Sequence, residues 1–205
     1  MAKKLVNIKE TGTTTVGIVC KDAVILAAEK KSTLGYLVAS KESEKIIPLD
    51  DHIAMTIAGA SGDAQILARY LKAEFKLFEI LHRRKIMVKG AATLLSNILQ
   101  SSKYLPYYVQ LIIGGVDEKG PHLFDLDAIG GIEEEKKFTS TGSGSPIALG
   151  VLEDQYKEDM TIEEGKELAK RAIKAAIERD IASGGKGIDI AVITKEGIKI
   201  ESEKF

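Results

Sequence analysis

The sequence predicts a layered α+β domain, and three observations support this class. Strand-like runs and helix-like periodic segments follow one another in the order strands, two helices, strands, two helices, strands. This grouping favours sheets covered by paired helices over alternating strand–helix–strand units. A length of 205 residues suits one domain with a sizeable core. No repeat, low-complexity tract or linker divides the chain.

The strands are expected from apolar and β-branched runs. At the start of the chain these runs are residues 14–20, 23–28, 34–39 and 53–58. The polar pair Lys21-Asp22 between the first two predicts a hairpin. The glycine-containing stretch 59–63 ends the fourth run and opens a helix. Later strands are expected over residues 109–116, 122–126, 188–194 and 198–200.

Four helices are expected from apolar residues at three- and four-residue spacing. The first has the stripe Leu67, Tyr70, Leu71, Leu77, Phe78 and Leu81, interrupted by Glu74. The second has Ala91, Leu94, Leu95, Ile98 and Leu99 on one side. A third is expected over residues 146–156. The fourth opens with a capping box, Thr161 and Glu164, and has the buried face Leu168, Ala169, Ala172, Ile173, Ala176 and Ile177.

Composition and charge narrow the possible partners and compartments. The chain is 44% hydrophobic and 29% charged with a net charge of -1, which is ordinary for a soluble globular protein. Without a basic block, neither nucleic acid nor an anionic membrane is expected as a partner. No apolar run reaches the roughly 18 residues of a membrane span, and the opening segment lacks the apolar stretch of a secretory signal. The single cysteine, Cys20, favours a reducing cytosol, so we expect a cytoplasmic protein.

Several familiar catalytic and binding patterns are missing from the sequence. None of the three histidines, His52, His82 and His122, lies near a G-x-S-x-G elbow, and no such elbow exists, which disfavours a histidine triad. Asp125 and Asp127 share a strand face, but solvated edge charge is the ordinary explanation. The glycine-rich stretches match no phosphate loop. We therefore expect neither a metal nor a cofactor.

The stretch Gly12-Thr13-Thr14-Thr15 has two interpretations. It is a turn and a strand start, because threonine suits a pleated surface. Alternatively, the bond between Gly12 and Thr13 is cleaved and Thr13 becomes the N-terminus. A free α-amine, with a pKa of about 7.7–8.0, can accept the threonine hydroxyl proton directly or through one water. This chemistry needs no histidine, but it requires removal of residues 1–12.

Six motifs, taken in order, resemble the β subunit of the proteasome, most closely the archaeal type. They are TTTVG at 13–17, Lys45, IAG at 57–59, GDAQ at 62–65, STGSGS at 140–145 and RDIASGG at 179–185. Each is weak alone, but the whole series is specific and extends to about Thr194. The resemblance implies a four-layer αββα sandwich of the N-terminal nucleophile hydrolase kind. It also implies a propeptide at 1–12, removed on maturation, and a peptidase domain at 13–205.

The resemblance implies roles for the first three site residues. Thr13 resembles the catalytic threonine, freed by self-cleavage after Gly12. Lys45 matches the active-site lysine, whose ammonium would favour the alkoxide and keep the amine neutral. Glu29 stands where many members have aspartate as the partner of that lysine. Without the resemblance, Lys45 would be a solvated residue and Glu29 half of a surface ion pair with a neighbouring lysine.

Four further residues match the remaining catalytic positions. Gly59 matches the glycine whose N–H stabilises the oxyanion, although a strand-to-helix turn would also require glycine there. Ser143, Asp180 and Ser183 match the cluster that orients the threonine amine. Seen alone, Ser143 would be a helix N-cap, and Asp180 would be an unfavourable carboxylate at a helix C-terminus. That misplaced charge favours a functional reason for Asp180.

A substrate pocket beside the threonine also follows from the resemblance. It would be lined by Ser32, Thr33, Ile47, Ile57 and Ser61. Ile57 at its floor brings no charge, which favours cleavage after apolar residues. Backbone groups around Thr33 and Gly59 would pair with an extended peptide as an added strand.

The function expected from the resemblance is that of a threonine endopeptidase acting on unfolded proteins inside a closed barrel. The expected partners are other β subunits in a seven-membered ring, α-subunit rings and an unfoldase ATPase that acts through the α rings. One rival is a structural, non-catalytic β subunit that keeps its propeptide. Another is the bacterial ATP-dependent peptidase, which consists of two stacked hexamers. The GSGS segment and residues 180–183 fit the proteasome type better than this peptidase.

Overall fold

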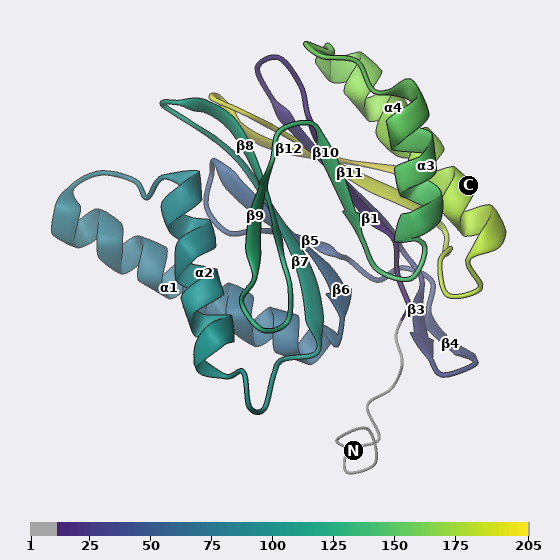
Figure 1. Ribbon diagram of the computed structural model, residues 1–205, viewed down its shortest axis with the longest axis horizontal. Helices are drawn as coiled ribbons and strands as arrows, with labels where there is room; N and C mark the ends of the chain where they lie inside the picture. Colours follow the sequence, from purple (N-terminus) through teal and green to yellow (C-terminus); the bar gives the residue numbers. More distant parts are fainter. Residues whose placement is uncertain (1–11, 205) are drawn as a thin grey trace.

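The computed structural model describes residues 12–204, which form a four-layer αββα sandwich. Two five-stranded sheets lie face to face, and one helix pair covers the outer face of each (Figure 1). Helices α1 (Ser61–His82) and α2 (Val88–Ser101) cover one sheet, and α3 (Ser145–Gln155) and α4 (Ile162–Arg179) cover the other. The predicted fold class is therefore confirmed. Among residues 12–204, no helix is long and apolar enough to span a bilayer.

The first sheet has the strand order β10-β1-β2-β11-β12, with every neighbouring pair antiparallel. Its strands are β1 (Thr15–Val19), β2 (Val24–Glu29), β10 (Phe138–Thr141), β11 (Gly187–Thr194) and β12 (Gly197–Lys204). The predicted hairpin is confirmed, since Val19 pairs with Val24 across the turn. Because β1 lies between β10 and β2, the chain entering it at residue 13 lies against both of these strands.

The second sheet has the order β5-β6-β7-β8-β9 and is also antiparallel. Its strands are β5 (Ile46–Pro48), β6 (Ile53–Gly59), β7 (Val109–Asp117), β8 (Gly120–Leu126) and β9 (Ile132–Glu135). A separate hairpin consists of β3 (Ser32–Leu34) and β4 (Leu37–Ser40). It connects β2 of the first sheet to β5 of the second.

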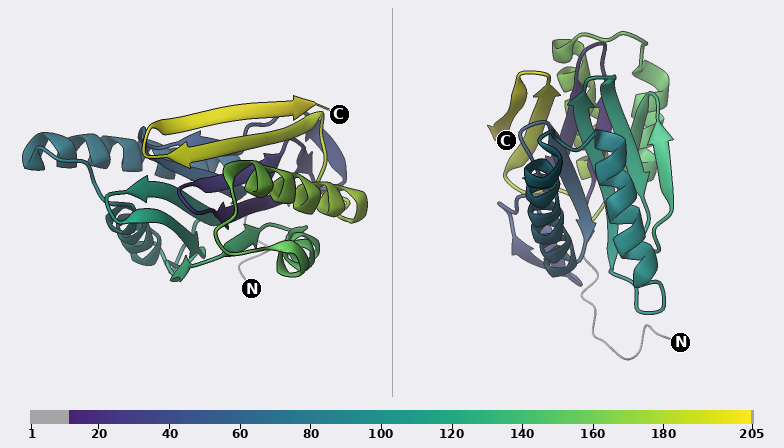
Figure 2. Two further views of the ribbon diagram at one scale, coloured as in Figure 1. Left: turned by 90° about the horizontal axis from the view of Figure 1, so that it is seen from above. Right: turned by 90° about the vertical axis from the view of Figure 1, so that its left-hand side faces the viewer.

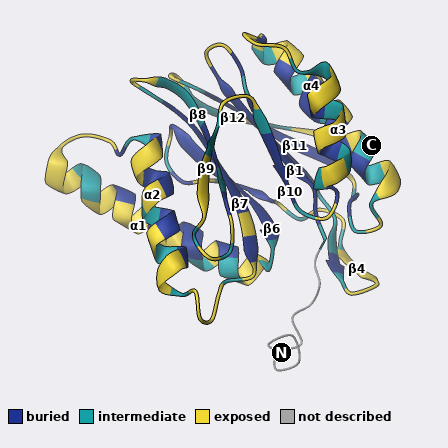
Figure 3. Ribbon diagram, in the orientation of Figure 1, coloured by how far each residue is buried: buried dark blue, intermediate teal, exposed yellow. Residues whose placement is uncertain are grey.

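The alternation of side chains along buried strands builds the three inner interfaces. In β2, Ile25 and Ala27 pack toward α3 and α4, whereas Val24 and Leu26 pack between the sheets. Strand β2 is consequently buried over its whole length. Figure 3 shows the labelled strands β1 and β7 mostly in the dark blue of buried residues as well. A strand buried on both faces reads as a continuous apolar run instead of an alternating one. Such a continuous apolar run is also easy to identify as a strand in the sequence.

One predicted strand is wrong, and one predicted helix face is wrong in part. The run 34–39 is not a single strand, because Gly35 adopts a φ of +61° and turns the chain from β3 into β4. In α1 the expected side chains of Tyr70, Leu77 and Leu81 are 50%, 49% and 67% exposed. Leu67 and Leu71 are buried as predicted, and Ala64, Ala68 and Phe75 complete the buried face. Small alanines let α1 approach its neighbours, and its C-terminal half projects beyond the sheets (Figure 2).

Candidate active site

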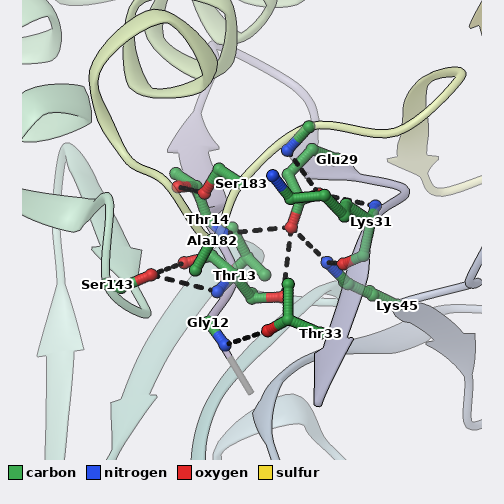
Figure 4. A network of polar contacts seen from close by, with 12 residues as sticks. Gly12, Thr13, Thr14, Glu29, Lys31, Thr33, Lys45, Ser143, Ala182 and Ser183 are labelled. Atoms are coloured by element: carbon green, nitrogen blue, oxygen red, sulfur yellow. Dashed lines mark hydrogen bonds and ion pairs between the residues drawn. The ribbon is translucent and has the colours of Figure 1, made fainter. Parts of the chain in front are cut away.

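The three threonines at the start of β1 point their hydroxyls toward different partners. Thr13 Oγ1 donates to Glu29 Oε1 at 3.1 Å. Thr14 Oγ1 lies 2.6 Å from Ser183 Oγ, and Thr15 Oγ1 lies 2.7 Å from Thr141 Oγ1. Thr13 is thus the threonine whose hydroxyl contacts a carboxylate, as Figure 4 shows.

Glu29 and Lys45 form a buried ion pair beside the Thr13 hydroxyl. Glu29, at the end of β2, is 0% exposed, and Lys45, just before β5, is 6% exposed. Lys45 Nζ contacts Glu29 Oε1 and donates to the Lys31 carbonyl at 2.5 Å. Lys45 is therefore buried instead of solvated, and Glu29 pairs with it and not with a neighbouring surface lysine.

Backbone N–H groups complete the surroundings of the Glu29 carboxylate. Glu29 Oε2 accepts from the N–H of Lys31 at 2.7 Å and of Gly184 at 2.9 Å. Glu29 Oε1 also accepts from the N–H of Thr14 at 3.3 Å. These donors replace the water that a carboxylate loses on burial. They also hold the carboxylate in one orientation toward Thr13.

Burial perturbs the titration of Lys45. Loss of water lowers the pKa of the Lys45 ammonium from its ordinary value, although the adjacent Glu29 carboxylate acts in the opposite direction. The ammonium therefore releases its proton more readily than a lysine in water does. A perturbed pKa at a buried charge next to a hydroxyl is typical of catalytic sites.

Ser143, Asp180 and Ser183 form a second polar cluster on the other side of Thr13. Asp180 Oδ2 accepts from Ser143 Oγ and from Ser183 Oγ, each at 2.6 Å. Ser143 Oγ in turn accepts from the backbone N–H of Thr13 at 3.2 Å. Asp180 follows the last turn of α4. The nitrogen that would become an α-amine after cleavage therefore lies against this cluster (Figure 4).

Thr14 belongs to the same cluster, and the sequence interpretation missed it. Because Ser183 Oγ gives its proton to Asp180, it accepts at the 2.6 Å contact, and Thr14 is the donor. Thr14 thus connects the Asp180 cluster to Glu29, which accepts its N–H. Its position next to Thr13 was the one available signal. The Lys31 carbonyl and the Gly184 N–H were also missed, since backbone groups have no residue signature.

Gly59 ends β6 in a conformation that favours glycine. Its φ is +108°, and a Cβ atom built on it would lie 2.2 Å from the Tyr108 carbonyl oxygen. The expected strand-to-helix turn is therefore present, with α1 beginning at Ser61. Its role as an oxyanion donor stays a prediction.

The predicted pocket residues lie on four neighbouring elements. Ser32 and Thr33 are in β3, Ile47 is in β5, Ile57 is in β6 and Ser61 begins α1. Thr33 Oγ1 accepts the N–H of Gly12 at 3.3 Å, so β3 contacts the residue before Thr13. Ile57 is buried and belongs to the core under α1, with Ile47 packed against that core. Their contact with substrate stays a prediction.

The carboxylates weighed as metal ligands have partners within the fold. Asp125 Oδ2 accepts from Thr139 Oγ1 at 3.0 Å, and burial raises the pKa of Asp125. Asp127 Oδ1 accepts the N–H groups of Ile129 and Gly131 and so organises the turn after β8. Within residues 12–204, the group close enough to hold a metal is Asp50, Asp51 and His52. Asp51 there already contacts Lys85.

Comparison with known proteins gives one consistent result. The sequence profile of the family described as "Proteasome subunit" matches residues 9–193. The chain is 56% identical over 194 residues to "Proteasome subunit beta" of Methanocaldococcus vulcanius, covering 94% of this chain and 86% of that protein. It is 58% identical over 190 residues to the protein of that name from Methanocaldococcus jannaschii, with 92% and 84% covered. The Methanosarcina barkeri protein of that name is 53% identical over 188 residues, with 92% and 89% covered.

Proposed function

Because the chain belongs to the proteasome subunit family, we propose that it is a catalytic β subunit and a threonine endopeptidase. Its relatives make it a β subunit of the proteasome core, which assembles into rings with other subunits. The nucleophile is Thr13, which becomes the N-terminus when the bond after Gly12 is cleaved by the subunit itself.

The observation that supports this proposal best is the environment of Thr13. Its hydroxyl contacts the buried Glu29–Lys45 pair, and its nitrogen contacts the Ser143–Asp180 cluster. Thr14 and Thr15 lack this combination, since within residues 12–204 their hydroxyls are hydrogen-bonded to other hydroxyls. A nucleophile needs a proton acceptor within about 2.6–3.2 Å, and Thr13 has one.

Cleavage of the leader requires a base other than the Thr13 nitrogen. Before cleavage that nitrogen is an amide, which donates a hydrogen bond to Ser143 and accepts no proton. The hydroxyl proton therefore passes to Glu29 Oε1, 3.1 Å away. Thr13 Oγ1 bonds to the Gly12 carbonyl carbon, the peptide C–N bond breaks, and the leaving nitrogen takes the proton that Glu29 had accepted. Water then hydrolyses the ester and leaves a Gly12 carboxylate and a free Thr13 amine.

Substrate cleavage repeats this chemistry with the free amine as proton acceptor. The Thr13 amine takes the hydroxyl proton, directly or through a water, while Oγ1 attacks the scissile carbonyl. The Lys45 ammonium stabilises the developing alkoxide and disfavours protonation of the amine. Asp180 and Ser143 orient the amine, and the Gly59 N–H stabilises the oxyanion. The acyl-enzyme ester is then hydrolysed by water.

The proposal extends to substrate and assembly. Unfolded polypeptides reach Thr13 inside a barrel of seven-membered β rings stacked between α rings, fed by an unfoldase ATPase. The apolar side chains of Ile47 and Ile57 favour cleavage after apolar residues. The cytoplasmic location expected from the sequence stays a prediction.

Mass spectrometry of the assembled particle tests the proposal directly. We expect the chain to begin at Thr13 and the particle to cleave peptides after apolar residues. Thr13→Ala should keep its leader and lose peptide cleavage while still entering rings. An assembled wild-type chain that keeps residues 1–12 and cleaves nothing would support the non-catalytic alternative. Peptide cleavage by an uncut chain would refute the role of the amine.

A further inference from the structure

We propose that Ala182 determines which residue can precede Thr13 at the cleavage junction. Its methyl group occupies the space that any side chain at position 12 would need, so that only glycine fits. This inference rests on the proposed cleavage between Gly12 and Thr13. It concerns a steric restriction that the fold itself imposes on the leader.

The geometry at Gly12 leaves no space for a side chain. A Cβ atom built on Gly12 would lie 1.9 Å from Ala182 Cβ and 3.2 Å from Ala182 Cα. Non-bonded carbon atoms prefer a separation of about 3.5–4.0 Å. The clash is too severe to be relieved without moving one of the two segments.

The segment that contains Ala182 is fixed on both sides by groups of the candidate site. Ala182 N–H donates to Asp180 Oδ1 at 3.3 Å, and Ser183 Oγ donates to Asp180 Oδ2. On the other side, Gly184 N–H donates to Glu29 Oε2 at 2.9 Å. Displacing Ala182 would therefore disturb both the Asp180 cluster and the Glu29–Lys45 pair.

The chain at position 12 is fixed as well. Gly12 N–H donates to Thr33 Oγ1 at 3.3 Å, and the next N–H, that of Thr13, donates to Ser143 Oγ at 3.2 Å. A side chain at position 12 could not swing away without breaking one of these bonds. Figure 4 shows Gly12 lying between Thr33 on one side and Ala182 and Ser143 on the other.

Ser143 contributes a weaker restriction at the same place. The Cβ atom built on Gly12 would lie 2.8 Å from Ser143 Oγ. This hydroxyl can rotate, but rotation would break its 2.6 Å bond to Asp180. Removing the Ala182 methyl should therefore relieve most, but not all, of the clash.

The expected consequence is slow cleavage when position 12 carries a side chain. A methyl group at position 12 would push the carbonyl carbon of this residue away from Thr13 Oγ1. A misplacement of about 1 Å in a reacting atom can lower a rate roughly 100-fold. We therefore expect Gly12→Ala to slow leader removal by about two orders of magnitude.

The test compares leader removal in five chains during assembly: wild type, Gly12→Ala, Ala182→Gly, and Gly12→Ala combined with Ala182→Gly or with Ile181→Gly. Mass spectrometry at successive times gives the fraction of chains that begin at Thr13. The combination with Ala182→Gly should be cleaved at least tenfold faster than Gly12→Ala. Ile181 is 87% exposed, so Ile181→Gly adds the same backbone freedom without removing the methyl group at 182. This matched combination should stay slow.

A second measurement shows whether Ala182→Gly acts on the space around position 12 or damages the catalytic residues. When it is expressed with the initiator Met directly before Thr13, so that removal of this Met leaves Thr13 first, the Ala182→Gly chain should hydrolyse peptides at close to the wild-type rate. The inference is overturned if Gly12→Ala is cleaved as fast as wild type, or if Ile181→Gly rescues as well as Ala182→Gly. A wild-type chain that is never cleaved removes the proposed function, and this inference with it.

Discussion

Replacing Lys45 by alanine should lower both the stability of the fold and the rate of peptide cleavage. Lys45 and Glu29 have side-chain exposures of 7% and 0%, so Lys45→Ala leaves Glu29 buried without its counter-ion. Breaking a buried pair in this way lowers stability by about 3–5 kcal/mol. The backbone N–H groups of Lys31 and Gly184 still donate to Glu29 in this variant. We therefore expect a loss of stability near the lower end of this range.

The matched control is Lys30→Ala. Lys30 forms a pair of similar burial with Asp189, at side-chain exposures of 16% and 7% and a distance of 2.6 Å. Asp189 also keeps a hydroxyl donor, that of Ser202. Both variants should therefore lose comparable stability in thermal unfolding. Only Lys45→Ala also removes a charge from the Thr13 hydroxyl.

Peptide hydrolysis by assembled particles supplies the decisive comparison. Loss of one group that stabilises developing negative charge lowers kcat by roughly 10²–10³-fold. We expect that loss for Lys45→Ala and a change below about threefold for Lys30→Ala, after correction for the assembled fraction. The double variant Glu29→Gln/Lys45→Met should recover stability without recovering kcat, since it removes both charges. Equal losses of kcat in the two single variants would refute the assignment of Lys45.

Three further predictions address the pH dependence, the second threonine and the cysteine. Burial lowers the Lys45 pKa and the Glu29 carboxylate opposes this, so Glu29→Gln should move the alkaline limb of kcat/KM to lower pH; an unmoved limb contradicts the role of the ammonium. Thr14→Val removes the hydrogen bond to Ser183 and should lower kcat roughly fivefold to tenfold. Thr14→Ser keeps the hydroxyl and should keep kcat close to the wild-type value. Burial raises the pKa of Cys20 to about 11, so the thiol should react with iodoacetamide at pH 8 only after unfolding; labelling of the native protein would contradict this.

The sequence predicted the central parts of the fold better than its edges. The apolar runs of β2 and β7 are buried on both faces and were identified as strands. The short strands β5 and β10 and the glutamate-rich β9 were missed, since three or four residues show little alternation. Strand β12 was expected to end at Ile200 but continues to Lys204, because its charged residues pair along β11. These edge strands form because they pair with neighbouring strands in the folded protein, and the local sequence pattern does not indicate this pairing.

The candidate site depended on a resemblance, because its members are distant in sequence. The contact between Thr13 and Ser143 joins residues 130 positions apart, and Thr14 and Ser183 are 169 apart. Taken alone, Lys45 is one lysine in a charged run, and nothing local indicates that it is buried. These residues were identified because the motifs occur in the same order as in the proteasome family. The structure brings six of the seven predicted catalytic residues into one contact network. Ala182 lies within the RDIASGG motif, but the motif gave no reason to expect a steric role for it.

In the proposed mechanism the same few side chains serve two reactions whose proton acceptors differ. In the uncut chain the Thr13 nitrogen is an amide that donates to Ser143, so the proposed acceptor of the hydroxyl proton is Glu29, which already accepts a hydrogen bond from that hydroxyl. After cleavage the nitrogen becomes an amine at the same place, and the Ser143–Asp180 cluster that held an amide N–H is suited to hold an amine N–H. Glu29 then serves mainly as the counter-ion of Lys45. Glu29→Gln should for this reason impair leader removal more than it impairs peptide cleavage by a chain that already begins at Thr13.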